Sequence, residues 1–117
     1  MRIPKHPTLI RRFRDARLKQ LRPHGPILAA SLVCIAKHCG RPGCRCQRGH
    51  KHIGHYLTYK QQGKTHTVYV PKELIPEVQT WIAEHRRLRR LTQEISCLSI
   101  AQVKSHVTAR RRRAARS

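Results

Sequence analysis

Acidic residues are scarce in this sequence. Its 117 residues include 5 Asp and Glu against 26 Lys and Arg, which gives a formal net charge of +21. So few, dispersed carboxylates argue against a nuclease that binds two metal ions, and the chain is not expected to be an enzyme. The positive excess is larger than solubility requires, and it predicts a nucleic acid as partner, because basic side chains that neutralise phosphates release condensed counterions. An anionic membrane surface is the alternative for charge alone, and it ranks second.

Aromatic residues and long apolar runs are also scarce. Aromatics make up 4% and hydrophobic residues 38% of the chain, and the second value is below the ~45–50% of an ordinary globular protein. These values predict one small domain whose core would gain from a metal ion. The apolar run at residues 27–35 is too short to span a bilayer, and no signal peptide is recognisable, so a cytoplasmic location is expected.

Cysteine, by contrast, is concentrated in one segment. Cys39, Cys44 and Cys46 place three thiols close together, and in a reducing compartment such thiols indicate a metal rather than disulfides. Zinc takes four tetrahedral ligands from thiolate and imidazole, and we expect His52 to be the fourth, with His50, His38 and Cys34 as alternatives. Four protein ligands leave no open position, so this zinc would be structural. A set of free thiols beside arginines is the competing interpretation. Cys34 and Cys97 are otherwise expected in the core.

Periodicity predicts helices at both ends of the chain. Thr8 is expected to cap a helix over residues 9–21, and a long helix starts near residues 72–73 and runs to about residue 95. Ser99 with Gln102 forms a capping-box pattern, which predicts a break near residues 96–99 and a second helix over 100–111. The Arg-rich tail is expected to be disordered until it binds.

Between these helices the pattern is that of strands. Residues 31–37 favour a strand, and residues 55–60 and 65–70 form a predicted hairpin around the turn 61–64. The fold class is therefore α+β: a small zinc loop and an antiparallel three-stranded sheet, flanked by an N-terminal helix and a long C-terminal helix. The expected division is a basic N-terminal arm at 1–26, a core at 27–95, and a C-terminal helix with an Arg-rich tail at 96–117.

From residue 31 to about residue 95 the chain resembles an uncharacterised prokaryotic family of small zinc-loop proteins. The residues that carry the resemblance are Ser31-Leu32-Val33, Cys39-Gly40-Arg41-Pro42-Gly43-Cys44-Arg45-Cys46, His52, Tyr56-Leu57-Thr58, Gly63-Lys64-Thr65 and Tyr69-Val70-Pro71-Lys72-Glu73-Leu74. The chain departs from the family pattern at Arg41, where Lys is frequent, and at His55, where Tyr is usual, so His55 becomes a further candidate ligand. Genes of the family tend to sit beside mobile elements, which implies a role in a mobile-element nucleoprotein complex.

The basic residues fall into groups that predict contacts with nucleic acid. The candidates are Arg11, Arg12, Arg14, Arg17, Lys19, Arg41, Arg45, Arg48, Lys51, Lys60, Lys64, Arg86, Arg87, Arg89, Arg90, Arg110, Arg111, Arg112 and Arg113. Such side chains clamp phosphates without reading sequence. The tyrosines Tyr56, Tyr59 and Tyr69 either stack on unpaired bases or, as we expect for at least two of them, pack between the strands and the helix.

Together these features predict a non-enzymatic accessory protein that binds DNA or structured RNA, with a structural zinc ion, in a mobile-element or ribonucleoprotein complex. The alternative is a protein-interaction module. In that case the helix 73–95 would dimerise, or dock on a larger nucleoprotein assembly, through Trp81, Leu88, Leu91 and Ile95.

Overall fold

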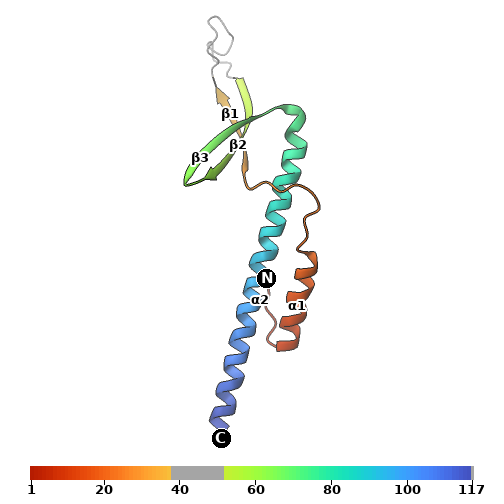
Figure 1. The fold of residues 1–117 in the computed structure, drawn as a ribbon, viewed down its shortest axis with the longest axis vertical. Helices are drawn as coiled ribbons and strands as arrows, with labels where there is room; N and C mark the ends of the chain where they lie inside the picture. The colour runs from red at the N-terminus through yellow and green to blue at the C-terminus, as the bar shows by residue number, and fades with distance from the viewer. Residues whose placement is uncertain (38–51, 117) are drawn as a thin grey trace, which may run out of the picture. The chain divides into compact units, whose positions relative to one another are not determined.

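The structure, a computed structural model, describes residues 1–37 and 52–116 (Figure 1). Along the chain it contains α1 (Pro7–Gln20), β1 (Ser31–Lys37), β2 (His52–Gln61), β3 (Lys64–Val70), the short 3-10 helix η2 (Lys72–Leu74) and α2 (Ile75–Arg116). The α+β class, the three strands and the flanking helices are confirmed. The chain divides into two compact units. We call Gly25–His85 the sheet unit, and Met1–His24 with Arg86–Ser117 the helical unit.

The sheet unit is built on an antiparallel sheet with the strand order β1-β2-β3. The predicted strand at residues 31–37 is confirmed, and the hairpin is longer than predicted, because β2 begins at His52. Gln61 pairs with Lys64, which leaves Gln62 and Gly63 as a two-residue turn. Both turn residues have positive φ, 53° and 77°, as the tight hairpin turn that matches strand twist requires.

One face of this sheet carries the core of the unit. Val70 of β3 is buried with Val78 and Ile82 of α2, and Leu28, Leu32, Leu57, Ile75 and Trp81 pack against them. Its sheet members share one face, because Leu32 pairs with Leu57 and Leu57 pairs with Val68, two residues before Val70. The Leu28 N–H also donates to the Trp81 carbonyl oxygen at 3.1 Å, which fixes the segment before β1 on the helix.

In the helical unit, α1 begins at Pro7, two residues before its predicted start at residue 9. Pro7 occupies the first turn, and the Nδ1 atom of His6 accepts the Thr8 N–H at 3.2 Å. His6 is therefore the N-cap, and the prediction of Thr8 is wrong. Proline at the start of a helix lacks the N–H that would be unpaired there, so the chain can turn into the helix at that point.

The second helix is continuous through the predicted break. Residues 96–99 are helical, and the Ser99 hydroxyl donates to the Ile95 carbonyl oxygen within the helix at 2.9 Å, instead of capping a new one. The expected disorder of the tail is also wrong, since α2 continues to Arg116. Beyond Pro76 the helix contains no Gly or Pro, and its last residues are mostly Arg and Ala, which are strong helix formers.

The two helices of the helical unit run antiparallel, side by side (Figure 1). Gln20 near the end of α1 contacts Arg87, whereas Arg14 contacts Gln102 further along α2. Ile10, Leu91 and Leu98 are the buried apolar residues in the described part of this unit. Positions 87, 91, 94, 98 and 102 recur at three- and four-residue steps, so Leu91 and Leu98 share the face of α2 that contacts α1. No helix in the described ranges 1–37 and 52–116 is long and apolar enough to cross a membrane.

Candidate nucleic-acid interface

The predicted zinc ligands lie largely outside the described residues. This holds for Cys39, Cys44 and Cys46, and for the alternatives His38 and His50. The backbone of His52 is described: it is the first residue of β2 and pairs with Lys37, the last residue of β1. The cysteine segment therefore connects two strands that are paired up to their ends. Within the described part of the chain, no group of three or more His, Cys, Asp or Glu residues is placed to bind a metal.

Two further candidate ligands face each other across the ladder that leads to this segment. Cys34 of β1 pairs with His55 of β2, three residues from each strand end. The expectation that Cys34 and Cys97 lie in the core is wrong, because both are exposed free thiols. Cys97 precedes the buried Leu98, and consecutive helical residues point about 100° apart, so Cys97 is turned away from the face that contacts α1.

Three of the candidate arginines are engaged within the helical unit. The Arg17 guanidinium donates to a Glu94 carboxylate oxygen at 2.9 Å and to the Phe13 carbonyl oxygen at 3.1 Å. Arg87 donates to the carbonyl oxygens of Gln20 and Arg22, at 3.0 and 2.7 Å. It thereby joins α2 to the end of α1 and to the segment that follows α1.

Arg14 is the third of these arginines. Its guanidinium contacts the Gln102 side chain and forms an ion pair with Asp15 at 3.3 Å. In Arg14, Arg17 and Arg87 the guanidinium groups thus serve to join α1 to α2. Sequence alone does not distinguish these three arginines from their exposed neighbours, because their partners lie far away along the chain.

The other candidates in the described ranges are exposed. They are Arg11, Arg12 and Lys19 on α1, Lys60 and Lys64 beside the hairpin turn, and Arg86, Arg89, Arg90, Arg110, Arg111, Arg112 and Arg113 on α2. Arg41, Arg45, Arg48 and Lys51 lie outside the described residues. Exposed basic side chains therefore occur in both units, and most of them belong to the helical unit.

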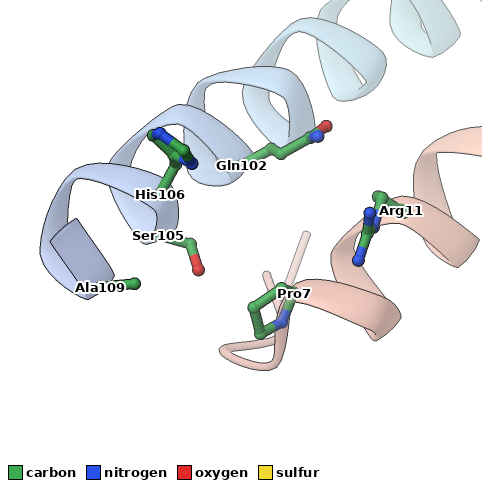
Figure 2. A pocket seen from close by; sticks show the side chains of 6 residues that line it. All are labelled: Pro7, Arg11, Gln102, Ser105, His106 and Ala109. Carbon is green, nitrogen blue, oxygen red and sulfur yellow. The ribbon is translucent and has the colours of Figure 1, made fainter. Parts of the chain in front are cut away.

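Basic residues also line two hollows along the seam between α1 and the C-terminal half of α2. One, of about 200 Å³, is lined by Pro7, Arg11, Gln102, Ser105, His106 and Ala109 (Figure 2). The other, of about 540 Å³, includes Lys5, Lys104 and Arg112. Neither lining contains an acidic residue, so both hollows suit an anion. Sequence reasoning missed Lys5, Lys104 and His106, because they come together only if α2 continues without a break.

The tyrosines form two separate contacts. Tyr56 and Tyr69 pair edge to face with ring centroids 5.6 Å apart, while Tyr59 stacks on His66 at 5.3 Å. The pairs lie on opposite faces of the sheet, because positions 56 and 59 differ by an odd number of residues along β2. Packing between strands is confirmed for these rings, but no tyrosine belongs to the cluster buried against α2.

Comparison with known proteins gives one match. Residues 9–80 fit the model of a family described as a domain of unknown function, DUF6788. The chain belongs to this family. No curated protein and no solved structure matches the chain. The DUF6788 segment includes nearly all of α1, which lies upstream of the resemblance noted at residues 31–95. It ends within α2, before the arginines at residues 86–90, so the basic C-terminal half of α2 lies outside it.

Proposed function

We propose that this DUF6788 protein is a non-enzymatic accessory protein that binds DNA or structured RNA. The observation that carries the proposal is the C-terminal part of α2, where Arg110, Arg111, Arg112 and Arg113 are exposed on a formed helix. Successive helical residues are about 100° apart, so four in a row present charge on every side of the helix. A helix that is already formed holds these groups at fixed spacings for phosphate contacts, which set the position of a protein on nucleic acid.

The proposal includes one structural zinc ion, held by Cys39, Cys44, Cys46 and His52. Its support is the chemistry of the donor set and the place of the segment between two paired strands. When bound, the zinc ion would cross-link the segment and would have no catalytic role. Genes of the family that the chain resembles tend to lie beside mobile elements. We therefore propose that the protein acts in a mobile-element or ribonucleoprotein complex.

Purification without nuclease tests both parts of this proposal. The full chain should retain nucleic acid that can be sequenced, and metal analysis should find one zinc per chain. The matched control is Cys97→Ser, which changes an exposed thiol outside the cluster and should keep the zinc, whereas Cys44→Ser should lose it. Protein free of nucleic acid at every purification step would contradict the binding proposal, and zinc retained by Cys44→Ser would contradict the ligand set.

A protein-interaction module is the second candidate, and one observation favours it. Ile100, Val103 and Val107 of α2 are 52%, 63% and 39% exposed, and their spacing places them on one side of the helix. The residues named from sequence are less suitable, since Leu91 is buried and Trp81 packs on the core. We call Ile100, Val103 and Val107 the apolar stripe. The basic residues around the stripe fit an acidic segment of a larger partner better than a second copy, which carries the same charge.

Sedimentation of nucleic-acid-free protein distinguishes an acidic partner from a second copy of the chain. If the stripe serves an acidic partner, the chain sediments as a 13.6 kDa monomer at every concentration. A dimer that Val103→Lys dissociates would show that a second copy covers the stripe instead.

A further inference from the structure

Among the residues that the structure describes, the second face of the sheet has no side chain in the buried cluster. Val33, Tyr56 and Tyr69 lie side by side in register across the three strands, and Ser31, Thr58 and Thr67 form the next row. Directly paired residues share a face, and neighbours along a strand alternate. This face is therefore the one opposite Leu32, Leu57 and Val70, and none of its residues belongs to the buried cluster.

Two aromatic rings at its centre are held in place. A Cβ atom on Gly54 would lie 2.9 Å from the Tyr56 ring, so the ring lies against the backbone where a side chain is missing. The Tyr69 ring meets it at an interplanar angle of 66°, and Tyr69 is 59% exposed. Tyr56 is partly buried, so the exposed ring of this pair is that of Tyr69.

The surroundings of these rings suit a polyanion with flat groups. Lys60 lies on the same face as Tyr56, four residues along β2, and is exposed. Hydroxyl groups of Thr58 and Thr67 lie between them and can donate hydrogen bonds. The sequences of β1, β2 and β3 contain no Asp or Glu, so no carboxylate of the strands repels a phosphate. An acidic protein would satisfy the charge but would have no use for the exposed ring of Tyr69.

From this arrangement we infer that the face formed by Val33, Tyr56, Thr58, Lys60, Thr67 and Tyr69 binds single-stranded nucleic acid by stacking unpaired bases. The inference rests on the proposed function and names its substrate class. Bases stack on aromatic side chains in a sequence-tolerant way, and in a duplex their faces are already occupied by neighbouring pairs. The protein therefore prefers single strands to duplexes, and the basic helices add affinity for either.

The other face supplies a matched control. Tyr59 belongs to the same strand as Tyr56, but its ring is stacked on His66 at an interplanar angle of 24°. Replacing Tyr59 with leucine removes one tyrosine ring from the sheet without touching the Tyr56–Tyr69 pair. Tyr69→Leu removes the exposed ring of that pair, and Tyr69→Phe keeps a ring that can stack.

The experiment measures the affinity of the full chain for an oligo-deoxythymidine strand and for a mixed-sequence duplex over a range of salt concentrations. Extrapolation to about 1 M salt removes most of the phosphate contribution, because log K falls linearly with log salt. The residual single-strand affinity should fall about five- to a hundredfold in Tyr69→Leu, the range expected for a lost base stack. It should stay within about twofold in Tyr69→Phe and Tyr59→Leu, and duplex affinity should not change in any variant.

A second readout does not depend on a variant that folds. A strand carrying 2-aminopurine loses fluorescence when its base stacks on an aromatic ring, so the wild-type chain should quench it. Salt-dependent binding without quenching, or with equal single-strand affinity in Tyr69→Leu and wild type, would overturn this inference and leave the proposed function intact. Failure to bind either the strand or the duplex would overturn both.

Discussion

Leu98→Ala tests whether the helical unit depends on its few buried side chains. Leu98 has no exposed surface, and replacing a buried leucine with alanine costs about 2–5 kcal/mol through lost burial and the cavity left behind. The unit has three buried apolar residues in its described part, Ile10, Leu91 and Leu98. So small a core can close partly around the cavity, and we expect the lower part of that range, ~2–3 kcal/mol.

The assay is amide hydrogen exchange of Pro7–Gln20 together with urea unfolding. A loss of ~2–3 kcal/mol should speed exchange of the α1 amides about 30- to 140-fold, since every 1.4 kcal/mol is tenfold. The control is Ile100→Ala, two residues away on the same helix and 52% exposed, which should change the stability by less than ~0.5 kcal/mol. Equal effects of the two substitutions, or unchanged exchange in α1 after Leu98→Ala, would refute the packing of α1 against this face of α2.

Two further predictions concern single contacts. Gly63 has a φ of 77°, so Gly63→Ala should lower the stability measured by thermal unfolding by ~1–2 kcal/mol, because a Cβ atom is strained in the left-handed region. Gly63→Asn should lower the stability less. A larger loss for Gly63→Asn than for Gly63→Ala would contradict the turn. The Arg17–Glu94 ion pair joins side chains that are about a quarter exposed, 23% and 24%. A double-mutant cycle of Arg17→Met and Glu94→Gln should give a coupling of ~0.5–1 kcal/mol that weakens with salt, and zero coupling at low salt would rule the pair out as a stabilising contact.

The strands are the part of the fold that local sequence determines. The β-branched and aromatic residues around Gln62 and Gly63 specify a hairpin with its register, because a tight turn admits few residue types. The helix ends could not be derived in the same way. Ser99 is compatible both with an N-cap and with a hydrogen bond to the preceding turn, and the choice depends on Leu98 being buried against α1, which no local pattern reveals.

The candidate interface, like the fold, could be predicted from the sequence only in part. Net charge and the position of the arginines are properties of the sequence, and they predict a polyanionic partner without any structure. Which arginines are available is not a local property. Arg17 and Arg87 find their partners across the helical unit, and the face with Tyr56 and Tyr69 is defined only once Leu57 and Val70 are seen to turn toward α2.

The salt dependence of nucleic-acid affinity is the most direct test of the central claim that this basic surface binds phosphates. If the protein neutralises six or more phosphates, its affinity for a single strand or a duplex falls about a thousandfold or more between roughly 50 and 200 mM salt. Lys104 and the arginines at residues 110–113 should account for much of that slope, so their replacement by glutamine should flatten it. Affinity that stays constant over this range of salt would contradict the proposed function.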